Sequence, residues 1–264
     1  MTKKTILFIH GLWMHSNTWE PWMKFFSGHG YQVLNPGWPG DGETVELWRA
    51  NPQAVANYGV KSIADHYARQ IEALKEVPIL VGHSFGGLLV QNLLGRGLGA
   101  AAVAIDPAPI QGVWQLPLSA LRASLPVLGN PFNLKKSISL TYPQFRYAFA
   151  NALPETEARE LYDRCTVPSP ARPLFQVAMA TLNPNSETRV NTSNENRGPL
   201  LITAGEKDHI VPPLLSMAAF KKYAKSKAVT DFKLFEGRGH SLAIDHGWNE
   251  VAAYSLQWLN RQGL

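Results

Sequence analysis

The chain has 264 residues, 45% of them hydrophobic, and a formal net charge of +5. This is enough for one full-sized hydrophobic core, and α/β domains often reach this length undivided. No run of about 18 apolar residues is present, so no membrane span is expected. The amino terminus has too short an apolar run for a signal peptide. The positive charge comes without a nucleic-acid-reading motif, so it indicates at most a mild attraction for anionic substrates or membrane surfaces.

Cysteine and metal-ligand patterns narrow the class further. The single cysteine, Cys165, excludes an internal disulfide and fits a reducing compartment, so we expect a cytoplasmic protein. No histidine–carboxylate cluster has metal-ligand spacing, and no glycine-rich phosphate loop is present. The sequence therefore predicts no metal and no cofactor, with a small molecule as the substrate and no nucleic-acid partner.

The first 106 residues alternate apolar runs with helical segments. Helix 60–74 is the clearest, because its apolar positions recur with a 3.6-residue period. A long loop rich in Gly, Pro and Asn is expected over 36–58. The predicted strands are 5–10, 31–35, 79–81 and 100–105, and the other predicted helices are 17–26 and 88–97.

The alternation resumes only near the carboxyl terminus. The predicted strands there are 199–205 and 232–235, and the predicted helices are 214–223 and 249–259. Strands alternating with helices predict an α/β fold with a mostly parallel sheet of about six strands and helices on both faces. A bare loop of about ninety residues is improbable in a compact domain. We therefore expect a core of 1–106 and 198–264 with an inserted helical cap, 107–197, whose exit linker is 183–198.

The motif Gly82-His83-Ser84-Phe85-Gly86 reads G-x-S-x-G between an apolar strand and a helix-length apolar segment. This context is typical of a nucleophile elbow, a sharp turn that exposes the serine at the carboxyl end of a strand. Side chains two residues away on either side would clash, so glycine is required there. Ser84 is therefore the predicted nucleophile.

A serine nucleophile requires a base and an orienting acid. His240 follows the last strand in the glycine-flanked loop Gly237-Arg238-Gly239, so it is the predicted base. The acid should fall between serine and histidine in chain order. Asp208 and Asp106 each follow a strand on the same rim, and we favour Asp208.

An oxyanion needs two preorganised N–H donors. The predicted donors are the backbone N–H groups of Phe85 and Leu12, with Trp13 as the substitute for Leu12 if the loop is shifted. Gly11 should let this loop approach the serine closely. The predicted substrate contacts are Trp13 and, in the cap, Trp114 and Tyr142.

These motifs together resemble those of the α/β-hydrolase superfamily. They are His10-Gly11, the loop 39–44, the elbow 82–86, Gly205-x-x-Asp208-x-x-Val211-Pro212 and Gly239-His240. The resemblance implies the triad Ser84, Asp208 and His240, with Leu12 and Phe85 at the oxyanion. We expect no antiparallel hairpin of the kind that opens many members, and this trimming resembles the compact esterase and hydroxynitrile-lyase branch.

The leading hypothesis is a serine carboxylesterase that cleaves an ester, or a related acyl bond, of a small to medium apolar substrate through an acyl-enzyme. Two alternatives stay open: a ligand receptor with incidental turnover, and a carbon–carbon lyase or hydrolase on the same scaffold. The resemblance implies a threonine and a lysine in hydroxynitrile lyases where this chain has Gly11 and Ser241. These two positions favour ester hydrolysis over cyanohydrin cleavage.

Overall fold

The computed structural model describes residues 4–264 and is built on a six-stranded sheet in which every neighbouring pair is parallel. The strand order is β2-β1-β3-β4-β7-β8. The strands are β1 (Thr5–Ile9), β2 (Gln32–Leu34), β3 (Ile79–His83), β4 (Ala101–Ile105), β7 (Leu200–Gly205) and β8 (Thr230–Phe235). The predicted α/β fold class and the predicted number of strands are confirmed.

Burial explains why the central strands form where the apolar runs predicted them. Every residue of β3, β4 and β7 is buried, as expected for parallel strands covered on both faces. The two edge strands are partly exposed: β2 alternates exposed and half-buried residues, and in β8 only Phe235 is buried. A sheet edge has one neighbouring strand instead of two, so its strands bury less surface.

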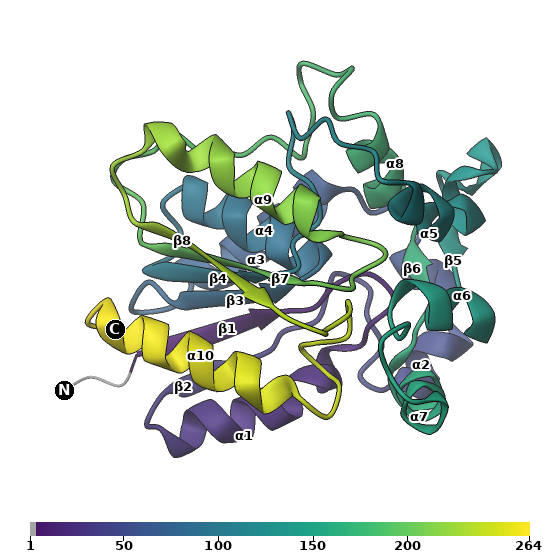
Figure 1. The fold of residues 1–264 in the computed structure, drawn as a ribbon, viewed down its shortest axis with the longest axis horizontal. Helices are drawn as coiled ribbons and strands as arrows, with labels where there is room; N and C mark the ends of the chain where they lie inside the picture. The colour runs from purple at the N-terminus through teal and green to yellow at the C-terminus, as the bar shows by residue number, and fades with distance from the viewer. Residues whose placement is uncertain (1–3) are drawn as a thin grey trace.

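Helices cover both faces of the sheet (Figure 1). On one face, α1 (Glu20–Gly28) and α10 (Trp248–Arg261) pack together, and their aromatic side chains share a core with β1 and β3. The opposite face carries α3 (Val60–Glu72), α4 (Phe85–Gly95) and α9 (Pro213–Lys221). Short 3-10 helices precede α1 (η1, Ser16–Trp19) and follow α9 (η4, Lys222–Lys225).

The predicted loop 36–58 is not wholly irregular, and this expectation is corrected. It contains α2 (Val45–Ala50) and the 3-10 helix η2 (Pro52–Val55). The Thr44 side chain accepts a hydrogen bond from the Leu47 N–H at 3.2 Å, which caps α2. Val45 and Trp48 are buried, so the short helix is held by packing.

The segment 107–197 connects β4 to β7 and lies mostly beyond the carboxyl ends of the strands, at one end of the sheet (Figure 1). It is mainly helical, with one antiparallel pair of two-residue strands. Its elements are α5 (Leu118–Leu128), η3 (Pro131–Asn133), β5 (Ser137–Ile138), α6 (Tyr142–Ala148), α7 (Glu155–Cys165), β6 (Ser169–Pro170) and α8 (Arg172–Ala178).

Residues 183–198 complete this connection without a helix or a strand. They run beside α4, where Asn92 Nδ2 donates to the Arg189 carbonyl and Asn194 Nδ2 donates to the Gly95 carbonyl, each at 3.1 Å. This stretch returns the chain to the start of β7. Among the helices of residues 4–264, none combines the length and apolar character needed to cross a bilayer.

Candidate active site

Ser84 occupies a strained turn between β3 and α4. Its backbone has φ 57° and ψ −118°, a conformation that residues other than glycine rarely adopt. A Cβ on Gly82 would lie 2.2 Å from the Gly86 carbonyl oxygen, and one on Gly86 would lie 2.0 Å from the Ile9 carbonyl oxygen. Both glycines are therefore required by the close approach of β1, β3 and α4, as in a nucleophile elbow.

The loop after β1 lies directly against this serine. A Cβ on Gly11 would stand 2.7 Å from Ser84 Cβ, so only glycine fits at this contact. The Trp13 N–H already donates to Ser169 Oγ at 2.6 Å, which leaves Leu12 as the better donor in this loop. The Phe85 N–H lies in the first turn of α4, where backbone N–H groups have no intrahelical acceptor.

His240 and Asp208 form a fully buried pair. His240 Nδ1 donates to Asp208 Oδ2 at 2.6 Å, while Asp208 Oδ1 accepts the N–H groups of Ile210 and Val211 at 2.8 Å each. Burial alone would raise the pKa of Asp208, but His240 and these N–H donors outweigh it and lower the pKa. Asp208 is therefore held as a carboxylate beside the imidazole.

Asp106 is a second buried carboxyl group at the same place. Its Oδ2 lies 3.9 Å from His240 Nδ1, while its Oδ1 accepts the Gly205 N–H at 2.9 Å. Burial, and next the charge of Asp208, raise the pKa of Asp106 well above its ordinary value. Burial thus favours the protonated form of Asp106, and the geometry favours Asp208 as the ionised acid.

His83 brings His240 next to the serine turn. His83 Nε2 donates to the His240 carbonyl at 2.8 Å, and the centroids of the two rings are 4.7 Å apart. Burial lowers the pKa of His83 to about 3, so His83 is neutral at working pH. Within the described residues, His240 Nε2 is buried and makes no hydrogen bond. This ring nitrogen therefore has no partner among residues 4–264.

Three side chains here could in principle hold a metal ion. The ligand atoms of His83, Asp106 and His240 lie within 4.8 Å of one another, a cluster that the sequence did not reveal. His240 Nδ1 is already bonded to Asp208, and His83 Nε2 to a carbonyl oxygen. His83 and His240 therefore each use a ring nitrogen in a hydrogen bond that positions His240. This arrangement fits a proton-transfer site better than a metal centre.

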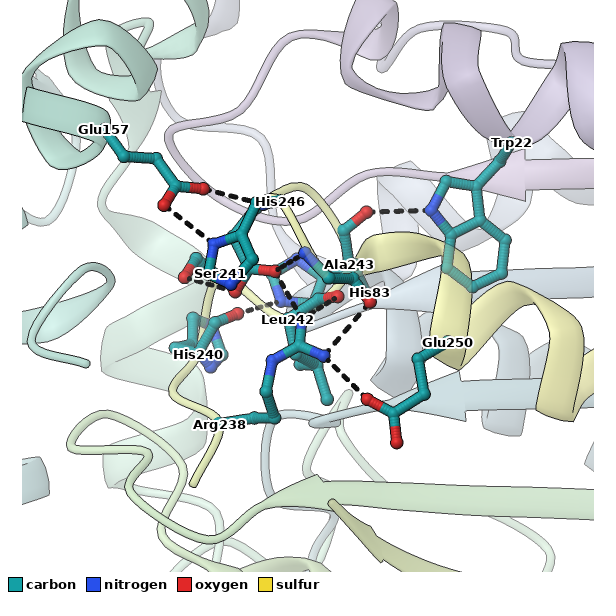
Figure 2. A network of polar contacts seen from close by, with 12 residues as sticks. Trp22, His83, Glu157, Arg238, His240, Ser241, Leu242, Ala243, His246 and Glu250 are labelled. Atoms are coloured by element: carbon teal, nitrogen blue, oxygen red, sulfur yellow. Dashed lines mark hydrogen bonds and ion pairs between the residues drawn. The ribbon is translucent and has the colours of Figure 1, made fainter. Parts of the chain in front are cut away.

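The loop that carries His240 is held by Arg238 (Figure 2). The Arg238 guanidinium forms ion pairs with Asp245 and Glu250 and donates hydrogen bonds to the carbonyl oxygens of Leu242 and Gly247. Asp245 also accepts the Ser241 hydroxyl at 3.1 Å. Sequence reasoning missed this network, because nothing in the spacing of Arg238 and Asp245 shows that the loop folds back between them.

Replacing Arg238 with glutamine should destabilise the protein and disturb His240. Asp245 has a fully buried side chain, and burial raises its pKa even beside Arg238, so removing the guanidinium leaves a buried carboxyl group without its partner. Breaking such a pair costs about 3–5 kcal/mol. Denaturant unfolding measures this loss. An unchanged free energy of unfolding would contradict the role of Arg238, and Arg189→Gln, at an exposed arginine, is the surface control.

An apolar cavity of about 350 Å³ opens at Ser84. Its walls come from the β1 loop, the elbow, the segment 107–197 and the start of α9. The lining side chains include Trp13, Ser84, Phe85, Val113, Trp114, Leu116, Leu121, Leu128, Leu174, Val177, Ile210 and Leu215. The predicted contacts Trp13 and Trp114 thus lie on the cavity wall.

Tyr142 does not line this cavity, and its predicted role as a substrate contact is corrected. The side chain is half-buried at the start of α6, where its hydroxyl donates to Glu155 and Arg159 lies over its ring, 3.3 Å from the centroid. Tyr142 therefore packs within the outer layer of the segment. Aromatic character alone could not distinguish an inner from an outer position.

The comparisons with known proteins agree with this architecture. A sequence model of the Alpha/beta hydrolase family matches residues 6–254, nearly the whole chain, and the chain belongs to this family. A search of curated proteins finds no match.

Solved structures with the same fold cover both chains almost completely. The monoacylglycerol lipase of Paleococcus ferrophilus is 22% identical, with a TM-score of 0.68 over 98% of this chain and 94% of that one. A methylesterase from Arabidopsis is 15% identical, with a TM-score of 0.66 over 97% and 99%. Tomato methylketone synthase I, complexed with 2-tridecanone, is 15% identical, with a TM-score of 0.70 over 99% and 100%. At these identities the likeness establishes the fold, and most of these neighbours are esterases or lipases.

Proposed function

We propose that this protein is a serine hydrolase that cleaves carboxylic esters by a Ser84–His240–Asp208 triad. The observation that carries the proposal is the buried 2.6 Å hydrogen bond between His240 and Asp208 beside a serine held at positive φ on an apolar cavity. A structural histidine would not need an ionised buried acid on one ring nitrogen and a free second nitrogen. Both features are those of a general base.

The reaction begins when His240 Nε2 takes the proton of Ser84 Oγ as the oxygen attacks the ester carbonyl carbon. The tetrahedral oxyanion accepts hydrogen bonds from the Leu12 and Phe85 N–H groups. Asp208 stabilises the imidazolium, which then gives its proton to the departing alcohol oxygen. Water, deprotonated by His240, attacks the acyl-Ser84 ester, and the released Ser84 oxygen regains the proton with the carboxylic acid as product.

The cavity supports a small to medium apolar acyl or alkyl group as the substrate moiety. Its walls are mainly leucine, valine, isoleucine and tryptophan side chains, and its volume of about 350 Å³ is at the small end of ligand pockets. We propose that residues 107–197 act as a cap over Ser84, since they supply a large part of this wall. We also propose a cytoplasmic location, supported by Cys165 being a buried free thiol.

Rapid mixing with an activated aryl ester tests the acyl-enzyme. We expect a burst of about one equivalent of phenol per active site when deacylation is slow, or an acyl group trapped on Ser84 and located by mass spectrometry. Turnover without any covalent intermediate on Ser84 would contradict the proposed mechanism. Labelling by a fluorophosphonate with no turnover of any ester in a graded panel would support the receptor alternative instead.

Mandelonitrile in the same assay separates hydrolysis from carbon–carbon cleavage. Ser241 Oγ is buried and donates to Asp245, so the residue after His240 provides no positive charge for a departing cyanide. Gly11 also leaves no side chain beside Ser84 to occupy the oxyanion region. We therefore expect ester hydrolysis without useful cyanohydrin cleavage. Efficient mandelonitrile cleavage in the absence of ester turnover would overturn the esterase proposal.

A further inference from the structure

Exposed apolar side chains gather on the segment 107–197. Of the fourteen strongly exposed large apolar residues in 4–264, nine belong to this segment, which is about a third of the chain. Leu118, Phe132 and Leu116 are 84%, 80% and 74% exposed. A concentration of this kind marks an interaction surface, whereas scattered exposed leucines need no explanation.

Helix α5 turns leucines toward solvent. Leu118, Leu121 and Leu125 follow one another at three- and four-residue spacing and share the exposed face, while Ala123 and Val127 are buried on the opposite side. A surface helix normally carries polar residues on its outer face. The apolar outer face of α5 is therefore typical of a helix that packs against a partner, and nothing in residues 4–264 covers its three leucines.

This face is continuous with the substrate cavity. Trp114, Leu116 and Leu121 line the cavity and are at the same time 67%, 74% and 43% exposed. The exposed apolar surface is thus continuous with the cavity wall. We call it the lid face, and it consists of Trp114, Leu116, Leu118, Leu121, Leu125 and Phe132.

The charged residues of the stretch that carries the lid face are all basic. No aspartate or glutamate occurs between Asp106 and Glu155, whereas exposed Arg122, Lys135 and Lys136 lie in or just after the lid face. Leucines and an aromatic ring beside basic side chains are the features of a helix that lies in the interface of an anionic membrane. A second copy of this chain would bring a surface of the same charge against the lid face.

We propose that the lid face docks on an anionic lipid surface and receives apolar substrate from it. Docking is independent of catalysis, but the delivery of substrate rests on the proposed esterase function. The leucines would enter the headgroup boundary while the basic residues contact lipid phosphates, so that the cavity entrance faces the lipid.

Sedimentation with vesicles tests the docking in the Ser84→Ala variant, which cannot hydrolyse the lipid. We expect binding to vesicles of phosphatidylcholine with phosphatidylglycerol, weaker binding to pure phosphatidylcholine, and loss of binding in high salt. Leu118→Glu/Leu125→Glu should weaken binding about tenfold or more. The matched control is Val77→Glu/Val229→Glu, which adds the same two negative charges in place of exposed apolar side chains. These two valines lie outside the lid face, next to the amino ends of β3 and β8.

Other outcomes would overturn the proposal. These are the absence of vesicle binding, equal binding by the leucine variant, and equal weakening by the valine control. A concentration-dependent dimer of the free protein in light scattering, lost in the leucine variant, would assign the lid face to a second copy instead.

Activity on two forms of one ester tests the delivery of substrate. Leu118 and Leu125 do not line the cavity, so Leu118→Glu/Leu125→Glu should hydrolyse a water-soluble ester at the wild-type rate. Its rate of hydrolysis of a vesicle-borne ester should fall about tenfold. If the variant matched the wild-type rate on both forms of the ester, the proposed delivery of substrate from the lipid would be overturned. If the wild-type protein hydrolyses neither ester but still binds vesicles, the esterase proposal fails while the docking stands.

Discussion

Ser84→Ala is expected to abolish ester turnover, with a fall in kcat of about a millionfold. The loss should be this large because the hydroxyl forms the covalent bond, and no other nucleophile lies on the elbow beside the oxyanion donors. Fluorophosphonate labelling should disappear with it. Initial rates on an activated ester and labelling followed by mass spectrometry measure both effects.

The fold should survive this change, because alanine adds no atoms at a position packed against Gly11. Ser27→Ala, at an exposed serine on α1, is the control and should leave activity and stability unchanged. A Ser84→Ala protein that is folded and keeps more than a few per cent of the wild-type rate would assign the nucleophile elsewhere.

Asp208→Asn should lower kcat by about ten-thousandfold with little change in KM. An asparagine side chain would present either an amide donor or a weak acceptor to His240 Nδ1, so the correct tautomer and the imidazolium both lose their stabilising charge. The apolar walls that bind the substrate would be unchanged. Steady-state kinetics on a soluble ester check the split between kcat and KM.

Asp106→Asn is the matched comparison for this variant. Burial favours the protonated form of Asp106, which lies 3.9 Å from His240 Nδ1, and asparagine resembles that form, so kcat should fall less than about tenfold. If Asp106→Asn were the more damaging of the two changes, the orienting acid would belong at the end of β4.

The same variant should change how stability depends on pH. Unfolded Asp106 loses its proton near its ordinary pKa of about 3.9, whereas burial keeps it protonated to higher pH in the fold. Folding therefore takes up a proton in this range, and the free energy of unfolding falls as pH rises through it. Asp106→Asn removes this effect, so its stability relative to the wild type should be greater at about pH 8 than at about pH 4.

The sequence predicted the sheet and the elbow well because their signals are local. Continuous apolar runs located β1, β3, β4 and β7, shorter mixed runs located the edge strands β2 and β8, and the glycines at 82 and 86 located the serine turn. The sequence did not reveal α2, where a threonine cap was hidden in a stretch rich in Gly, Pro and Asn. Six residues are too few to show a helical period.

The remaining details of the site depend on contacts between distant residues. Whether Asp208 or Asp106 stands closer to His240 depends on how the loops after β4, β7 and β8 converge, which only the coordinates show. The same holds for Tyr142, which does not line the cavity although Trp114 of the same segment does.

The course of residues 183–198 bears on how substrate preference can change in this protein. Two adjacent parallel strands require the chain to travel back along the sheet, and here this irregular stretch, fixed to α4 by Asn92 and Asn194, makes the return. Residues 107–182 are not part of this return path, but they contact the loops of the site: Ser169 Oγ accepts the Trp13 N–H, and the Phe149 carbonyl accepts the Ser241 N–H. A segment exchanged for residues 107–182 would therefore have to keep these two contacts. The return path, and with it the spacing of β4 and β7, would not have to be rebuilt.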